Sequence, residues 1–346
     1  MNMIRGKDTD MSEKITLSHG SGGRASHDLI EKLFVASFGS KSLGDLEDSA
    51  VIQAGREKIA FSTDSFVVDP IFFPGGDIGS LAVHGTVNDL AMRGARPLYL
   101  SVGMIIEEGF AYKDLETIVR SLKDGTDKAG VEIVAGDTKV VQSGKADRIF
   151  INTTGIGLLD MEFDISARNG RPGDTIILSG TMADHGATIL CQREGLLIEG
   201  GFTSDSAPLN HMVAAMLKKA GKSVHVLRDP TRGGVGTTLN ELAMSSGVGI
   251  RIHEKGLPIR DDVRGACELL GLDPLYLANE GKLLAFVAPE AAESLLAVMQ
   301  QMEFGENACI IGEVTADHPG QVVLETIIGS ARIIDMLHGE PLPRIC

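Results

Sequence analysis

Acidic residues recur in the first half of the chain beside apolar runs that are typical of strands and helices. They are Asp45 and Asp48 in GDLEDSAV, Asp64 in STDSF, Asp89 in VNDLA and Asp137 in AGDTKV. Each one alone could be a turn former or a helix N-cap. Five in one half favour a Mg²⁺ site, because Mg²⁺ takes hard oxygen ligands and lets an acidic site accept a triphosphate.

A lysine follows the last of these carboxylates. Lys139 lies two residues beyond Asp137. It could neutralise a phosphate group or, if it is desolvated, serve as a base.

The second half holds a candidate anion site at RDPTRGGVGTTLNELA, where two glycines open a helix. Backbone N–H groups at the helix start, the helix dipole and Arg232 could bind an anion, with Arg228 and Asp229 beside them. A glycine turn that caps the helix explains the glycines equally well, but not both arginines. Glu280, just before the apolar strand KLLAF, is by itself an ordinary surface glutamate.

Two glycine patterns are candidates for nucleotide-binding loops. GKS at 221–223 has the ending of a Walker A motif, but Met216 stands where that motif needs glycine, which favours a helix C-cap. GSGGRA at 20–25 matches a looser dinucleotide pattern and has Asp45 at a suitable distance. A dehydrogenase is therefore one alternative.

The chain ends in GEPLPRIC, so that Cys346 is the last residue. A frayed end with an incidental cysteine is the usual interpretation of such a terminus. The last eight residues could span about 26 Å, and Pro341 and Pro343 would keep them extended. A cation, either Arg344 or one from a partner, should stabilise a thiolate beside the terminal carboxylate.

Composition indicates a two-domain protein of the cytoplasm. The chain has 346 residues, 43% of them hydrophobic, and a net charge of −15, which argues against nucleic-acid binding. The N-terminus lacks the apolar region of a signal peptide, and no apolar run is long enough to cross a membrane. The four cysteines form no CxxC pair, which favours reduced thiols rather than zinc or disulfides.

Periodicity predicts an α/β protein in two halves, joined by the polar linker SARNGRPGD at 166–174. The predicted parts are a disordered leader (1–14), an N-terminal domain (15–165), a C-terminal domain (172–337) and a mobile tail (338–346). The predicted strands are 14–17, 49–53, 58–68, 97–106, 131–137, 148–159, 175–180, 224–227, 282–288, 308–315 and 321–329. The predicted helices begin near residues 25, 77, 112, 183, 207, 229 and 289.

Eight motifs occur together in both halves: HGSGG, LEDSAV, STDSFVV, HGTVNDLAMRGARP, AGDTKVV, DPTRGG, NEGKL and the terminal PRIC. With them the chain resembles, from about residue 15 to its end, the HypE family of hydrogenase maturation factors. These are carbamoyl dehydratases of the PurM-like (AIR synthetase) superfamily. The resemblance implies two PurM-like α/β domains, a homodimer with a β-barrel built from paired N-terminal sheets, and ATP with Mg²⁺ bound between the halves.

The resemblance also implies roles for particular residues. Cys346 would be the acceptor thiol, and Lys139 and Glu280 a pair that handles protons, with the choice of base left open. The nucleotide and metal set would be Asp48, Asp64, Asp89 and Asp137. Further nucleotide contacts would come from Gly20, Gly22, Gly23, Asn88, Thr138, Asp229 and Arg232.

The implied reaction is ATP-dependent dehydration of an S-carbamoyl group on Cys346 to a thiocyanate. A HypF-type carbamoyltransferase would supply the carbamoyl group, and a HypC–HypD scaffold would receive cyanide for the iron centre of [NiFe]-hydrogenase. The nearest alternatives are an AIR synthetase, a selenophosphate synthetase or a thiamine-phosphate kinase. A non-catalytic nucleotide-binding scaffold is the alternative from another class.

Overall fold

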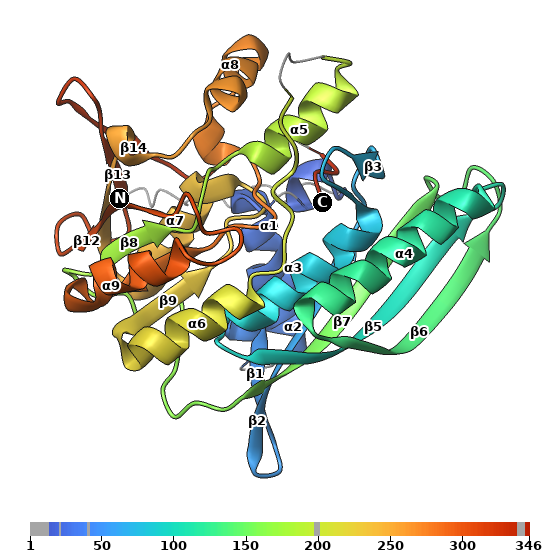
Figure 1. Cartoon of the computed structure of the whole chain (residues 1–346), viewed down its shortest axis with the longest axis horizontal. Helices are drawn as coiled ribbons and strands as arrows, with labels where there is room; N and C mark the ends of the chain where they lie inside the picture. Colours follow the sequence, from blue (N-terminus) through green and yellow to red (C-terminus); the bar gives the residue numbers. More distant parts are fainter. Residues whose placement is uncertain (1–13, 21, 40–41, 197–200, 338–342) are drawn as a thin grey trace, which may run out of the picture.

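The computed structural model of the protein describes residues 14–20, 22–39, 42–196, 201–337 and 343–346. Two sheets with their helices form two α/β units side by side (Figure 1). The predicted leader lies outside the described residues except for Lys14, as does most of the predicted tail. No helix in the described ranges is long and apolar enough to cross a membrane.

The N-terminal unit is a five-stranded sheet in the order β1-β2-β7-β5-β6, with two long helices on one face. Asp77 starts the first of these helices with a capping box, in which its side chain accepts from the amides of Gly79 and Ser80. The strands are β1 (Ala50–Ala54), β2 (Glu57–Phe66), β5 (Arg96–Glu107), β6 (Glu132–Val141) and β7 (Ile149–Leu159), with the short pair β3 (Phe72–Phe73) and β4 (Gly76–Asp77). The helices are α3 (Ile78–Met92) and α4 (Tyr112–Ala129).

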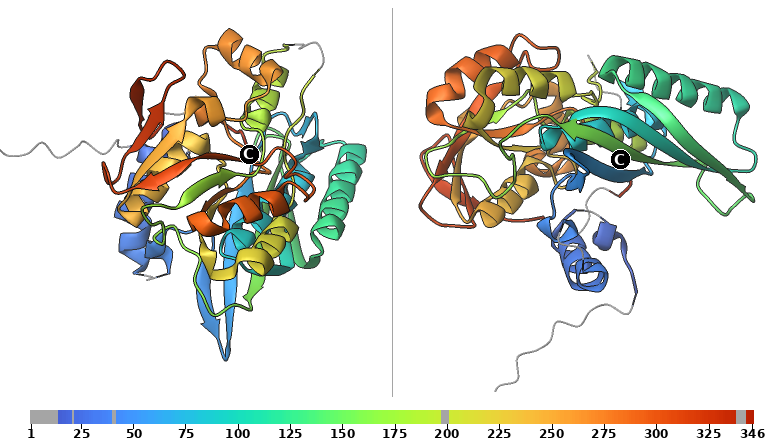
Figure 2. Two further views of the ribbon diagram at one scale, coloured as in Figure 1. Left: turned by 60° about the vertical axis from the view of Figure 1, so that its left-hand side comes forward. Right: turned by 90° about the horizontal axis from the view of Figure 1, so that it is seen from below.

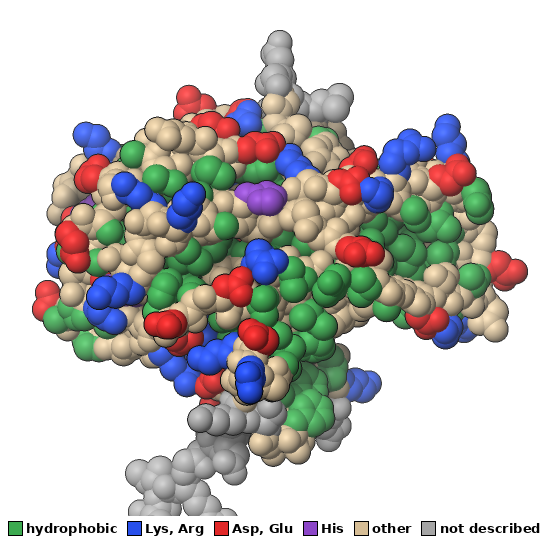
Figure 3. All heavy atoms as spheres, turned by 60° about the horizontal axis from the view of Figure 1, so that its bottom comes forward, with side chains coloured by type: hydrophobic (Ala, Val, Ile, Leu, Met, Phe, Trp, Pro, Cys, Tyr) green, Lys and Arg blue, Asp and Glu red, His purple; other side chains and the backbone are tan. Residues whose placement is uncertain are grey.

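The two faces of this sheet differ in burial. On one face, Val102 and Thr153 are buried under α3 and α4. On the other, which we call the open face, Phe61, Tyr99 and Ile105 are each at least 40% exposed. Figure 3 shows that hydrophobic side chains also gather on the surface of the half that holds α4 and β5–β7.

The C-terminal unit has a seven-stranded sheet in the order β14-β13-β10-β12-β8-β11-β9. The predicted elements of this half are confirmed, and β10, α8 and β14 are additional. The strands are β8 (Thr175–Leu178), β9 (Val224–Arg228), β10 (Gly249–His253), β11 (Leu284–Val287), β12 (Cys309–Thr315), β13 (Val322–Glu325) and β14 (Ala331–Ile334). The helices are α5 (Asp184–Arg193), α6 (Asn210–Ala220), α7 (Gly234–Ser246), α8 (Asp261–Leu270) and α9 (Pro289–Met299).

An N-terminal arm of short helical segments stands beside the two units, below them in the right-hand view of Figure 2. It comprises η1 (Leu17–Gly20), α1 (Arg24–Leu29), the π-helix η2 (Ile30–Val35) and α2 (Ala36–Phe38). The predicted strand at 14–17 is therefore wrong. Ile15 and Leu17 are 72% and 69% exposed, so this short apolar run does not join a sheet and forms a tight turn instead.

Candidate active site

A cavity of about 860 Å³ lies between the two units, with the N-terminal arm forming one wall. This volume is within the range typical of cofactor and substrate sites. Among the residues that line it are nine singled out from the sequence: Gly22, Asp45, Asp48, Asp64, Asp89, Arg228, Asp229, Arg232 and Glu280. Cys346 lines it as well, although it is the last residue of the chain.

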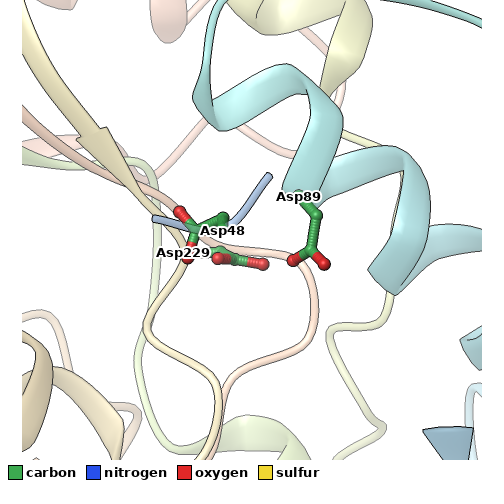
Figure 4. Close-up of side chains that lie close together, drawn as sticks. All are labelled: Asp48, Asp89 and Asp229. Carbon is green, nitrogen blue, oxygen red and sulfur yellow. The ribbon is translucent and has the colours of Figure 1, made fainter. Parts of the chain in front are cut away.

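Three carboxylates converge in this cavity (Figure 4). Asp48 precedes β1, Asp89 lies on α3 and Asp229 follows β9, and an oxygen of each lies within 4.8 Å of the others. Ser62 on β2 donates to Asp89 Oδ2 at 2.6 Å and to the carbonyl of Asp48 at 3.1 Å. The cluster therefore joins the two units of the fold.

Burial shifts the pKa of each carboxyl in the cluster. Desolvation raises the pKa of Asp48 and Asp89 well above the usual range, and neighbouring acidic groups add to the effect. Desolvation also raises the pKa of Asp229, to about 6. Oδ2 of Asp48 is buried without a hydrogen-bond partner. Since such a cluster needs protons or a cation to offset its charge, it fits a divalent metal ion.

Asp64 extends the acidic wall. It lies on β2 opposite Thr153 of β7, so its side chain points to the face of the sheet that α3 covers. Its charge raises the pKa of both Asp89 and Asp229, although desolvation is the larger cause for each. Asp64 is therefore placed beside the cluster and could share a metal ion or a bound nucleotide with it.

Two arginines balance the acidic groups. Arg228 Nε lies 2.8 Å from Asp48 Oδ1, and its Nη2 lies 3.5 Å from Glu241. Arg232 has its pKa raised, above all by the charge of Cys346. The cation beside the terminal residue is therefore Arg232, whereas Arg344, expected from the sequence, forms an ion pair with Asp147.

The glycine loop packs against Arg232. Arg232 Nη1 donates to the carbonyl of Gly20 at 3.2 Å. Gly22 has φ +81°, and a Cβ there would lie 3.0 Å from Cβ of Arg232. A Cβ on Gly23 would lie 2.5 Å from the carbonyl of Leu337. The glycines thus allow the N-terminal arm to approach the C-terminal unit closely at the cavity.

Glu280 is held with its carboxyl in the cavity by its neighbours in NEGKL. Asn279 accepts from the amide of Ala183 at 2.7 Å, and Lys282 Nζ lies 3.2 Å from Asp205. Asp205 also accepts from the amide of Glu280 at 3.1 Å. The side chain of Glu280 is 3% exposed and its Oε1 has no hydrogen-bond partner. Desolvation, with nearby acidic groups, raises the pKa of Glu280 well above its usual range.

The end of the chain is docked rather than extended into solvent. The C-terminus lies near the middle of the molecule in both views of Figure 2. Ile345 is 4% exposed and belongs to the core that includes Phe66 and Val68. Residues 338–342, with Pro341 among them, lie outside the described part of the chain.

Three residues predicted in the site lie elsewhere in a single chain. Asp137, Thr138 and Lys139 are on β6, the edge strand, and do not line the cavity. Register places Asp137 opposite Gly103 of β5, which is opposite Asn152 of β7. Directly opposed residues share a face, so Asp137 and Lys139 point to the open face, away from Asp64. They form an ion pair at 2.6 Å.

Asn88 is not a cavity residue either. Its Nδ2 donates to the carbonyl of Ala207 at 3.0 Å, and its Oδ1 accepts from the amide of Leu209 at 2.8 Å. Asn88 therefore fixes the segment before α6 to α3. This is a structural role that the neighbouring Asp89 does not share.

Part of the cavity wall was not predicted from the sequence. Ser62, His27 and Glu241 line it, yet none was singled out. Ser62 lies in the same strand motif as Asp64, two residues away and on the same face, which was a usable signal. Glu241 and His27 come from a helix and an arm whose placement depends on tertiary contacts.

The chain matches two family models in order along its length. Residues 46–159 match the N-terminal domain of AIR synthase related proteins, and residues 171–325 match the C-terminal domain. The fold and the cavity thus define a protein of the AIR synthase related, or PurM-like, class, with two such domains.

Similar proteins narrow the class. The carbamoyl dehydratase HypE of Azotobacter vinelandii is 52% identical over 332 residues, which cover 96% of this chain and 97% of that protein. A crystal structure of hydrogenase maturation protein HypE in complex with ATP is 52% identical, with a TM-score of 0.82, covering 96% of this chain and all of that one. A HypE–HypF complex structure is 48% identical with a TM-score of 0.85, covering 89% of this chain and 99% of that one.

The chain belongs to the HypE family of carbamoyl dehydratases, ATP-dependent enzymes of hydrogenase maturation. This confirms the resemblance inferred from the eight motifs. It also sets aside the dehydrogenase, the other enzymes of the superfamily and the non-catalytic scaffold considered above.

Proposed function

We propose that the cavity between the two domains is where the S-carbamoyl group of Cys346 is dehydrated with MgATP. One observation carries this assignment: the terminal cysteine lines the same cavity as the acidic cluster and Glu280. A substrate attached to the chain's own end would thus meet the nucleotide without leaving the protein.

The chemistry requires a better leaving group than the oxygen of an amide. The carbonyl oxygen of the S-carbamoyl group attacks the γ-phosphorus of ATP, and the bond from that phosphorus to ADP breaks. Both protons then leave the nitrogen as the C–O bond breaks and a C≡N bond forms. The products are an S-cyano group on Cys346, ADP and phosphate, so the oxygen of the amide ends in phosphate.

The acidic cluster is the proposed metal site. Asp48, Asp89 and Asp229 offer converging carboxylate oxygens, and Asp64 lies beside them. Mg²⁺ held there would neutralise the phosphate charge that this acidic wall would otherwise repel. Asp229 was predicted among the nucleotide contacts rather than the metal ligands. In this proposal Asp229 is a metal ligand instead of Asp137, which was the residue predicted from the sequence.

Arg232 is the proposed anion-binding residue. It lies beside Cys346 and at the glycine loop, with its own charge favoured by the surrounding carboxylates. A guanidinium in this position can stabilise both the terminal carboxylate and a developing phosphate. The loop of Gly20, Gly22 and Gly23 would cover the nucleotide from the side of the arm.

Glu280 is the proposed base of the dehydration step. Its Oε1 is buried in the cavity and lacks a partner, so it is available for the nitrogen protons of the carbamoyl group. A carboxyl whose pKa desolvation raises well above its usual range is, once ionised, a stronger base than an ordinary glutamate. Lys139 of the same chain does not line this cavity.

A homodimer is proposed to complete the site. The exposed apolar side chains Phe61, Tyr99 and Ile105 lie on the open face, where a second copy would cover them. Phe61 also lines the cavity, so a copy packed on this face would border the site. The Asp137–Lys139 pair lies on the same open face. A barrel of paired sheets could therefore bring these two residues to the partner's cavity.

The proposed partners are the protein that supplies the carbamoyl group and the protein that receives the cyanide. A HypF-type protein would carbamoylate Cys346, in line with the HypE–HypF complex of similar fold. A HypC–HypD scaffold would then receive the cyanide. Cys191, Cys267, Cys309 and Cys346 form no disulfide bond, which fits a reducing compartment, the cytoplasm.

Intact-mass spectrometry tests the proposal. Incubation with a HypF-type enzyme, carbamoyl phosphate and ATP should first add a carbamoyl group and then remove one water. The control is Cys309→Ala, which changes a cysteine outside the cavity and should leave the sequence of masses unchanged. Carbamoylation without any loss of water, with MgATP present, would contradict the assigned reaction.

A further inference from the structure

The terminal residues lie along the segment that follows β2, in the manner of an added strand. The amide of Val67 donates to a terminal carboxylate oxygen of Cys346 at 2.9 Å, and the amide of Asp69 donates to the carbonyl of Arg344 at 3.2 Å. Alternate amides thus bind backbone oxygens of alternate residues, as in β-strand addition. Between them, the side chain of Ile345 enters the core.

Two side chains of α5 bind the carbonyls of Pro343, Arg344 and Ile345. Arg193 donates from Nη1 to the carbonyl of Pro343 at 2.6 Å and from Nη2 to that of Arg344. His185 Nε2 lies 2.7 Å from the carbonyl of Ile345. The carbonyls of Pro343, Arg344 and Ile345 each have a donor, and so does the terminal carboxylate of Cys346. An incidental terminus would not need all of these contacts.

The geometry fixes the tautomer of His185. Its Nε2 faces a carbonyl, which can only accept, so this nitrogen carries the proton. Its Nδ1 then accepts from the hydroxyl of Ser204 at 2.8 Å. His185 is fully buried and stacks edge-on against Phe73, with the ring centroids 5.5 Å apart. The hydrogen bonds of both ring nitrogens thus fix the orientation of the His185 ring toward the terminal segment.

The side chain of Arg344 is bound as well. Its Nε donates to the carbonyl of Val67 at 2.8 Å, and its guanidinium forms an ion pair with Asp147. Its backbone has φ +56°, a left-handed conformation that is unfavourable for residues other than glycine. The contacts of Arg193 and Asp147 must hold this residue in place against that preference.

We propose that Arg193 and His185 are positioning residues that bind the backbone of residues 343–346 and hold the thiol of Cys346 in the cavity. This inference rests on the proposed function, because the cavity is taken to be the site of dehydration. The contacts are to carbonyl groups and to Arg344, so a carbamoyl group on Sγ would leave them intact. The docked segment must be released for Cys346 to reach a carbamoyltransferase.

Hydrogen exchange of two amides tests the docking without any assay of function. The amides of Val67 and Asp69 donate to the terminal segment, so their exchange reports its release. Arg193→Gln in the full chain should speed their exchange at least about tenfold, since it removes charged donors from two tail carbonyls. In Arg193→Lys, which keeps one compact cation, the exchange rate of these amides should lie between the rates in Arg193→Gln and in the unmodified protein. Arg120→Gln, on the exposed side of α4, is the matched control.

A second comparison addresses His185. His185→Gln keeps an N–H donor near the position of Nε2 and should retain most of the protection of Val67 and Asp69. His185→Leu, whose side chain has no hydrogen-bond donor, should lose the protection of these two amides. If these amides exchange at the unmodified rate in both Arg193→Gln and His185→Leu, the inference is overturned.

Single-turnover dehydration of the carbamoylated protein gives the catalytic readout. Arg193→Gln should slow the loss of water at least about tenfold while carbamoylation proceeds at its normal rate or faster. If the unmodified carbamoylated protein does not dehydrate, the proposed function is contradicted. The hydrogen-exchange result still tests whether Arg193 and His185 hold the terminal segment. If Arg193→Gln exposes Val67 and Asp69 but dehydrates normally, the positioning role is refuted.

Discussion

The side chains of Asp64 and Asp137 point to opposite faces of one five-stranded sheet. Asp64 is opposite Thr153 and faces α3, whereas Asp137 is opposite Gly103 and faces outward. Three strand spacings, about 14 Å, separate their strands. The two carboxylates cannot bind the same metal ion within one chain.

Asp64→Asn should weaken MgATP binding at least about tenfold, because an amide lacks the charge that attracts the metal complex. Isothermal titration calorimetry measures the affinity. Asp160→Asn, a surface carboxylate paired with Arg96, is the control and should bind normally. Undiminished affinity in Asp64→Asn would remove this residue from the nucleotide site.

A charge on the open face should prevent dimerisation. Ile105→Glu places a carboxylate where a second copy is proposed to pack, and burying a charge there costs several kcal/mol even with Lys139 directly opposite. Sedimentation velocity should show a dimer for the unmodified protein and a monomer for the variant. Tyr112→Glu, on an exposed position of α4, should remain dimeric. A dimeric Ile105→Glu protein would show that the subunits pair elsewhere.

Glu280→Gln should stall the reaction after carbamoylation. Loss of a general base typically costs 10²–10⁴-fold, so the stalled protein should stay one water heavier than the cyano form. Because the pKa of Glu280 is raised, the dehydration rate of the unmodified protein should rise with pH as this carboxyl loses its proton. A pH-independent rate, or normal turnover by Glu280→Gln, would exclude it as the base.

Metal removal should make stability depend on pH. The pKa of Asp229 is raised from 3.8 to about 6 in the folded protein. The contribution of this carboxyl to the free energy of unfolding is therefore greatest below pH 4, and it is lost as pH rises through about 6. In a chelator, Tm should therefore fall between pH 4 and 7 more for the unmodified protein than for Asp229→Asn. Mg²⁺ should raise Tm more at pH 7 than at pH 4. Identical pH profiles for the two proteins would contradict this account of the cluster.

Local pattern was sufficient to predict most of the fold. The amphipathic run at 112–129 and Gly130, which adopts φ +70°, predicted α4 and its end correctly. The strand at 249–253 was missed because it is short and has turn residues on both sides. The strand predicted at 14–17 failed for the opposite reason, since the local pattern was present but no sheet lies beside it.

The site residues could be predicted only where the local sequence around each residue was sufficient to identify it. Asp48, Asp64 and Asp89 were identified as acidic residues beside apolar runs, and the structure brings them to one cavity. Asp137 was grouped with them because nothing in a single strand tells which face of a sheet it will occupy. Asp229 joins the cluster through packing between domains, which residue spacing cannot reveal.

Docking of the terminus also depends on distant residues. The composition of GEPLPRIC suggests an extended and mobile end. Binding of its carbonyls by Arg193 and His185 depends on where α5 lies, 150 to 160 residues earlier in the chain. Motif resemblance could therefore identify the acceptor residue but not how it is held.

The most direct test of the account is the mass of the C-terminal peptide after a complete reaction. The carbamoylated protein, treated with MgATP, should yield a peptide in which Cys346 has lost one water from its carbamoyl form, together with one ADP per thiol. The same treatment without ATP should leave the carbamoyl mass unchanged. A loss of water located on any other residue, or ADP released without it, would contradict dehydration at Cys346.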